Sequence, residues 1–140
     1  MVIVGMLFNP MNMLAYKIDH LLPSLTLFYG GLLMASNMIW SHEIVHYLSM
    51  GHFNIKLFLL GVLLSIFIII FLLRNQYGIK PTQWLKRMIP HHSTALTTSK
   101  ALVKNNNQII KNKPKLKKLI TDIIDTQEKE IKIMKDMLTN

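Results

Sequence analysis

The first half of the chain contains two long segments without a charged side chain. The more apolar one covers residues 57–73, and Lys56 and Arg74 flank it. At about 1.5 Å per residue this run is slightly short for a hydrocarbon core of about 30 Å, but the two flanking cations can extend to the membrane interfaces. No other element of the chain is large enough to cover a helix that is apolar all round. The pattern therefore predicts a membrane-spanning helix over residues 57–73.

The second uncharged segment covers residues 21–40. It contains small residues that suit close packing against a second membrane helix, namely Gly30, Gly31, Ala35 and Ser36. Trp40 and Tyr47 fit the aromatic belt of a membrane interface. Because the connection between the two segments is brief, we expect an antiparallel transmembrane hairpin over residues 20–76, preceded by an N-terminal tail at residues 1–19.

The second half of the chain, residues 79–140, changes to a helical period of about 3.6 residues. After Pro81, apolar or small residues recur on one face at Trp84, Leu85, Met88, Ile89, Ala95, Leu96, Ala101 and Leu102. Pro90 is expected to bend this helix or to begin a new first turn. A Lys-rich connector that ends near Pro114 leads to a second amphipathic helix, whose apolar positions run from Leu116 to Leu138. The sequence therefore predicts an all-α protein, in which a transmembrane hairpin precedes a hairpin of two amphipathic helices.

Charge divides the chain at the same place. The net charge of +9 lies entirely after residue 73, and this half is predicted to attract anionic lipid, nucleic acid or an acidic protein. The charge alone does not name a partner. Membrane lipids are expected from the predicted spans, and nucleic acid is a less favoured partner because no nucleic-acid-binding motif is visible. Basic residues beyond the second span outnumber the lone Lys56 in the connection, which predicts a multi-pass integral membrane protein with both termini in the cytoplasm.

The chain has no cysteine, so a metal site would have to use His, Met, Asp or Glu. Met88, His91 and His92 share one face of the first amphipathic helix. Glu130 and Met134 lie on one face of the second amphipathic helix. If the two helices form an antiparallel hairpin, Glu130 or Met134 could lie near the histidines. Thioether and imidazole donors suit copper, especially Cu(I).

These residues also carry a resemblance to a known family. Residues 84–95, with the motif MIPHH, and the downstream pattern around Gln127, Glu130 and Met134 resemble a membrane-anchored branch of the ferritin-like domain of unknown function family three hundred and five. The resemblance implies a ferritin-like helical fold over residues 79–140 and a copper-handling role. It names Met88, His91, His92, Glu130 and Met134 as the candidate metal ligands. The chain departs from the family at Thr98, where a methionine is common.

A literal HExxH motif, His42 to His46, lies at the end of the first uncharged segment. In metalloproteases this spacing binds zinc through both histidines and uses the glutamate as general base. A catalytic zinc site also needs a third ligand and a substrate cleft, for which this segment offers little scaffold. We therefore expect no enzyme. The same stretch is predicted, as a second possibility, to form an interfacial soft-metal cluster of His42, His46, Met50 and His52.

Two functions follow from the sequence. In the first, the membrane-anchored helical domain binds a copper-type ion and self-associates, because a lone two-helix hairpin cannot bury its apolar stripe and a dimer would complete a four-helix bundle. In the alternative, a non-enzymatic structural or interaction protein of a cellular or viral membrane contacts anionic partners through its basic C-terminal domain.

Overall fold

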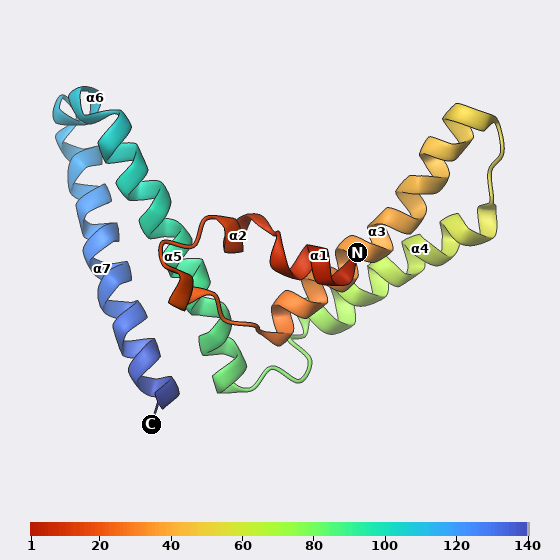
Figure 1. Cartoon of the computed structure of the whole chain (residues 1–140), viewed down its shortest axis with the longest axis horizontal. Coiled ribbons are helices and arrows are strands. Elements are labelled where there is room, and N and C mark those ends of the chain that lie inside the picture. Colours follow the sequence, from red (N-terminus) through yellow and green to blue (C-terminus); the bar gives the residue numbers. More distant parts are fainter. Residues whose placement is uncertain (140) are drawn as a thin grey trace. The chain divides into compact units, whose positions relative to one another are not determined.

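The computed structural model describes residues 1–139, and these residues form helices and no strand. The all-α prediction is therefore confirmed. Asn140, the last residue of the predicted C-terminal domain, lies outside the described residues. The elements in chain order are α1 (Val2–Leu7), α2 (Pro10–Met13), the 3-10 helix η1 (Ile18–His20), α3 (Leu25–Met50), α4 (Ile55–Phe67), the π-helix η2 (Ile68–Arg74), α5 (Pro81–Asn105), α6 (Asn107–Lys111) and α7 (Pro114–Thr139) (Figure 1).

The chain divides into two compact units that are not contiguous in sequence. Unit 1 contains residues 1–9 and 24–80, and unit 2 contains residues 10–23 together with the chain from Pro81 onward. The residues that the sequence assigns to an N-terminal tail are thus shared between the two units. Neither unit is formed by one uninterrupted segment.

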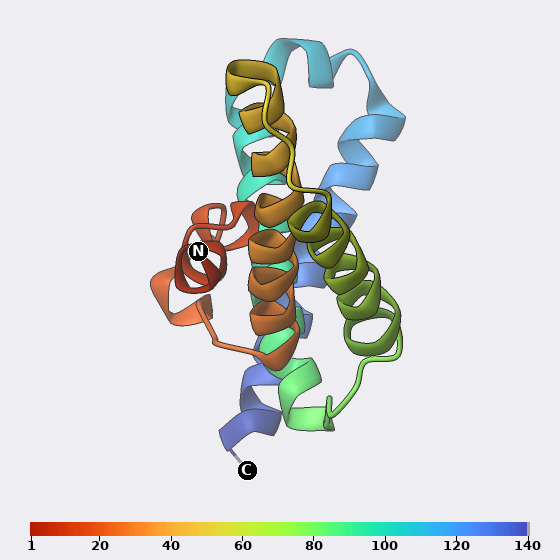
Figure 2. The same cartoon turned by 90° about the vertical axis from the view of Figure 1, so that its right-hand side faces the viewer.

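In unit 1, α3 and α4 form an antiparallel hairpin, which both views show side by side (Figures 1 and 2). Small residues allow the close approach. A Cβ atom added at Gly61 would lie 2.8 Å from the backbone nitrogen of Trp40, and the buried hydroxyl of Ser65 donates to Ser36 Oγ over 2.9 Å. Gly31 instead faces α1, because an added Cβ there would lie 2.8 Å from the carbonyl oxygen of Val2.

Local signals set the ends of these two helices. Ser24 accepts the amide of Leu27 at the start of α3, and Asn54 accepts the amides of Lys56 and Leu57 at the start of α4. Gly51 ends α3 in the left-handed region, with φ of 72°. The connection between the helices is therefore shorter than the 41–55 segment that the sequence indicates.

One helix among residues 1–139, Ile55–Arg74, is long and apolar enough to cross a membrane. The predicted span at residues 57–73 lies within it. The predicted second span at residues 21–40 is not supported, and neither is the multi-pass arrangement. The physical reason is that α3 begins only at Leu25 and continues to Met50 through a polar second half with Asn37, His42 and Glu43.

In unit 2, α5 and α7 form a second antiparallel hairpin joined through α6, and residues 10–23 pack against α5. The buried core consists of Ile89, Leu96, Ile131 and Met134, with Leu22, Leu85, Met88, Ile124 and Leu138 packed around it. The two predicted amphipathic helices are therefore present. Pro90 lies inside α5, which continues through it to Asn105. The ferritin-like fold and the four-helix bundle stay predictions.

Candidate functional site

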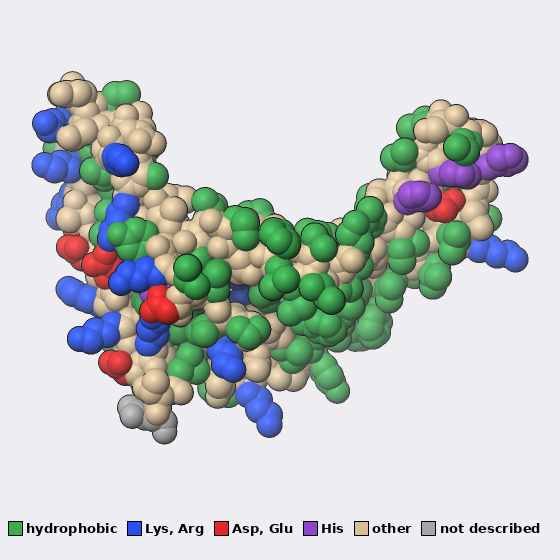
Figure 3. Space-filling view, in the orientation of Figure 1, with side chains coloured by type: hydrophobic (Ala, Val, Ile, Leu, Met, Phe, Trp, Pro, Cys, Tyr) green, Lys and Arg blue, Asp and Glu red, His purple; other side chains and the backbone are tan. Residues whose placement is uncertain are grey.

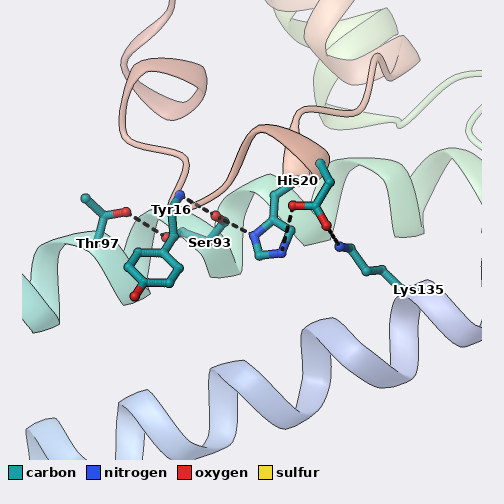
Figure 4. Close-up of polar contacts among 6 residues, drawn as sticks. Tyr16, His20, Ser93, Thr97 and Lys135 are labelled. Atoms are coloured by element: carbon teal, nitrogen blue, oxygen red, sulfur yellow. Dashed lines mark hydrogen bonds and ion pairs between the residues drawn. The ribbon is translucent and has the colours of Figure 1, made fainter.

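A buried serine joins residues 10–23 to α5. The Ser93 side chain is 0% exposed, and its Oγ accepts the backbone N–H of Tyr16 over 2.6 Å (Figure 4). The same Oγ lies 2.8 Å from Nδ1 of His20, which is 5% exposed. A serine hydroxyl has two acceptor sites and one proton, so Ser93 can take both contacts at once. Ser93 thereby joins the backbone of Tyr16 to the imidazole of His20.

An ion pair continues this network toward the surface. Nε2 of His20 lies 3.8 Å from Oδ1 of Asp19, and the other carboxylate oxygen of Asp19 pairs with Lys135 of α7. The hydrogen bond from Lys135 lowers the pKa of the Asp19 carboxyl. Burial lowers the pKa of His20, and the positive charge of Lys135 acts in the same direction. Residues from three elements are thereby held together.

Serine, histidine and aspartate also make up a hydrolase triad, but this arrangement cannot act as one. A nucleophilic hydroxyl has to reach a substrate, whereas the Ser93 hydroxyl is fully buried and in contact with Tyr16 and His20. The network is therefore a structural latch that fastens residues 10–23 onto the hairpin. The other end of this segment is fastened by Thr94, whose hydroxyl donates to the carbonyl of Met11 over 3.2 Å.

Beside the latch lies an open groove of about 370 Å³. Lys100 of α5 pairs with Glu128 of α7 at 2.5 Å and stands 4.3 Å from the centre of the Tyr16 ring, so cation–π and ionic contacts border the groove. The hydrogen bond to Glu128 raises the pKa of Lys100. The groove is lined by Tyr16, Lys17, His20, Leu96, Glu128, Ile131, Lys132, Lys135 and Asp136.

The structure brings two of the predicted metal ligands into direct contact. Nδ1 of His92 donates to the carbonyl of Met88 over 2.9 Å, and Nε2 of His92 lies 2.8 Å from Oε2 of Glu130 on α7. His91 lies one residue earlier on α5, which turns it by about 100° on a helix with 3.6 residues per turn. It lines a separate hollow of about 360 Å³ with Met11 and Leu14, among others. Burial lowers the pKa of His91, and His92 and Arg87 add to this effect.

The two methionines of the predicted set lie in or against the apolar core. Met134 is buried within the core cluster, and Met88 packs against it. Among residues 1–139, no group of three or more His, Asp or Glu side chains gathers in a way that could hold a metal ion. The assembled part of the predicted site is therefore a His92–Glu130 pair that joins α5 to α7.

The HExxH motif has a structural role in unit 1. The buried carboxylate of Glu43 accepts the backbone N–H of Asn54 over 3.1 Å, and Nδ1 of His46 donates to the carbonyl of His52 over 3.0 Å. The rings of His42 and His46 stack with centroids 6.1 Å apart. An open hollow of about 600 Å³ is lined by His42, Glu43, His46 and His52. Glu43 thus holds the turn between α3 and α4, while Met50 is exposed.

Sequence reasoning missed Tyr16, His20 and Ser93, although one signal was present. Ser93 lies between Ile89 and Leu96 on the apolar stripe of α5, where a polar residue requires a buried partner. A search for such a partner would have led to the N-terminal residues that seemed to be a tail. The pairing of Glu130 with a MIPHH histidine was anticipated by helical spacing.

Comparisons with known proteins place this chain in a family. A family model described as a domain of unknown function (DUF305) matches residues 80–138, which confirms the resemblance drawn from the sequence to that extent. The chain is 36% identical over 131 residues to "Uncharacterized protein L153" of Acanthamoeba polyphaga mimivirus, an alignment that covers 93% of this chain and 81% of the relative. No solved structure matches. The chain therefore belongs to the same family as the mimivirus protein L153, and its residues 80–138 match the model of the DUF305 domain.

Proposed function

We propose that this chain is a non-enzymatic membrane-anchored protein, in which Ile55–Arg74 holds the chain in a bilayer and unit 2 is a binding module. The observation that carries the proposal is the exposure of this helix. Its most apolar window is only 17% buried inside the protein. A core helix of a soluble protein is mostly covered, and a monomer rarely exposes a contiguous apolar patch above a few hundred Å². Exposed apolar surfaces of this kind mark membrane or protein interaction sites, and the length of this helix suits a bilayer core.

The first half of α3 is proposed to accompany this helix into the bilayer, which would make the protein multi-pass with both termini in the cytoplasm. Two features of the hairpin support this. Ser65 donates to Ser36 Oγ across the helix interface, and Gly61 lets the backbones approach, as small and hydroxyl residues do between membrane helices. The polar end of α3 around His42 would then lie at the membrane–water interface.

Anchoring is tested by alkaline carbonate extraction of the full chain from phosphatidylcholine vesicles. The wild-type chain should stay with the lipid. The variant Leu63→Lys/Phe67→Lys should be extracted, because each lysine in a membrane core costs about 3 kcal/mol on insertion scales. The matched control, Ile133→Lys/Met137→Lys, changes two similarly exposed apolar residues of α7 at the same spacing and should stay in the vesicles. Extraction of the wild-type chain would overturn the proposal.

Binding of a copper-type ion at unit 2 is the second candidate function. The geometry that favours it is the His92–Glu130 pair, in which a carbonyl orients Nδ1 of His92 and directs Nε2 to the partner helix. Backbone carbonyls orient metal-binding histidines in the same way. Met88, His91 and Met134 are the proposed additional donors. The same stretch of unit 1 that contains His42, His46, Met50 and His52 is a weaker candidate, because Glu43 is engaged in the turn.

Titration of the detergent-solubilised full chain with Cu(I) and with Cu(II) tests this candidate. His92→Ala should abolish uptake, and Glu130→Gln should weaken it, because a neutral amide replaces the carboxylate of a predicted ligand. His91→Ala separates two versions of the site, since it should weaken binding only if the predicted five-ligand set forms. A wild-type chain that takes up neither ion would exclude the candidate.

Self-association is proposed through the face of α7 that unit 2 leaves exposed. Residues 10–23 already cover part of the α5–α7 hairpin, but Ile133 and Met137, four residues apart on one face, are more than half exposed. A second copy could bury them. Sedimentation of the full chain in detergent should show a dimer or a larger assembly, and Ile133→Lys/Met137→Lys should run as a monomer.

A further inference from the structure

The end of the α5–α7 hairpin carries a dense and uncompensated positive charge. Six lysines lie between residues 104 and 118, and no acidic residue accompanies them. We call this group the lysine tip, and its members are Lys104, Lys111, Lys113, Lys115, Lys117 and Lys118. All six are exposed, and Figure 3 shows lysines gathered at the end of the hairpin that carries α6.

None of the lysines in this tip is neutralised within the described part of the chain. The lysines of unit 2 that form ion pairs are Lys100 and Lys135, which lie nearer the latch. The acidic residues of α7 begin only at Asp122, beyond the tip. The tip therefore keeps its full charge available for an external anion.

Apolar side chains are interleaved with these lysines. Ile109 is 57% exposed and Leu119 is 56% exposed, and Leu102 and Val103 are also exposed. Lysines beside exposed aliphatic side chains are the composition of helices that bind at a lipid interface. Single-stranded nucleic-acid sites instead use aromatic stacking and arginine, and residues 104–118 contain neither.

We infer that the lysine tip binds the anionic headgroups of a lipid bilayer, with Ile109 and Leu119 entering the interface. This deepens the proposed function and rests on it in one respect. An anchored chain meets headgroups at a far higher effective concentration than it meets a soluble polyanion. Each lysine near an anionic surface strengthens binding about fivefold.

The absence of cysteine allows a clean test. In the full chain, Asn107→Cys places one thiol on α6 for an environment-sensitive dye. The labelled protein is reconstituted into phosphatidylcholine vesicles with or without phosphatidylserine. The dye should become brighter and shift to the blue only with phosphatidylserine, and the change should disappear at about 1 M salt, where the Debye length is about 3 Å.

Two matched double substitutions in α7 test whether the dye response to phosphatidylserine depends on the lysine tip. Lys115→Gln/Lys118→Gln removes two lysines of the tip, and Lys129→Gln/Lys132→Gln removes two exposed lysines at the same spacing farther along the helix. The first pair should lower the ratio of docked to undocked protein about 25-fold, from two factors of about five. The second pair should leave the ratio within about twofold of the wild-type value, because a single remote pair lies more than a Debye length away. Equal effects of the two pairs would overturn the assignment of the site to the tip.

The two experiments distinguish an error in the lipid-binding inference from an error in the anchoring proposal. A chain that resists carbonate extraction but shows no dye response to phosphatidylserine would overturn this inference and leave the anchor standing. A chain that is extracted, yet responds to added phosphatidylserine vesicles, would overturn the anchor and support the tip. A response to added duplex DNA in neutral vesicles, with none to phosphatidylserine, would assign the tip to nucleic acid and refute the lipid site.

Discussion

Ser93→Ala removes the one hydroxyl on which the latch of unit 2 depends. Two groups lose their partner at once, namely the amide of Tyr16 and Nδ1 of His20. A buried polar group left without a partner costs about 1–3 kcal/mol. We use the lower end of this range for both groups, because water can reach them once residues 10–23 loosen. Tyr16 lies at the edge of the groove, and His20 lies next to the exposed Asp19. The expected loss is about 2 kcal/mol in the free energy of opening this segment.

Hydrogen exchange of the Tyr16 amide in the detergent-solubilised full chain measures that loss directly. Because every 1.4 kcal/mol corresponds to a factor of ten, exchange should accelerate about thirtyfold in Ser93→Ala. Ser99→Ala is the matched control, since it makes the same chemical change on the same helix six residues away. Its effect on the Tyr16 amide should be within about twofold. Unchanged exchange at Tyr16 in Ser93→Ala would refute the view that the serine holds this segment.

The remaining predictions concern the helix pair, the imidazole and the HExxH motif. Gly61→Ala should overpack against α3, which lowers the melting temperature of the full chain and its free energy of unfolding by about 1–3 kcal/mol. Gly30→Ala has open space at its Cβ and should raise the free energy of unfolding by about 0.5–1 kcal/mol. The pKa of His20 is lowered in the folded chain, so its contribution to stability is present above pH 6.5 and is lost as the pH falls through the folded pKa. Limited proteolysis of residues 10–23 should therefore become faster on acidification. The increase should be smaller in His20→Gln. Glu43→Gln should keep the bond to the Asn54 amide and the melting temperature, whereas Glu43→Ala should lose about 1–3 kcal/mol. A peptidase activity that Glu43→Gln abolishes would contradict this structural role.

The parts of the fold that sequence predicts well are those in which one property repeats over many residues. The uncharged run at 57–73 and the apolar stripe of α7 each have many positions that agree, so single exceptions do not obscure them. The predicted span at residues 21–40 is not supported to the same degree, because absence of charge alone does not make a helix apolar enough. Polar but neutral side chains such as Asn37 and His42 continue the same helix and reduce its hydropathy.

The candidate sites were harder to predict, because they depend on contacts between distant residues. Helical spacing alone brought His92 and Glu130 to facing positions, yet it could not show that His91 turns toward Met11 instead. Nothing periodic marks residues 10–23, whose placement depends on single bonds to Ser93 and Thr94 across more than seventy residues of chain. The HExxH pattern identifies His42, Glu43 and His46 as a group. That Glu43 holds the turn between α3 and α4 becomes visible only from its hydrogen bond to the amide of Asn54.

The interleaving of the two units has a consequence for how the protein is made. Residues 10–23 leave the ribosome before α4, yet the serine that fastens them comes at position 93. At 5–20 residues per second, the segment waits about 4–14 s for its partner helix. During this interval the apolar α4 is synthesised and becomes available for insertion. A fragment that begins at residue 79 therefore lacks an integral part of unit 2. Under the proposed function, α4 would enter the bilayer before the latch can close.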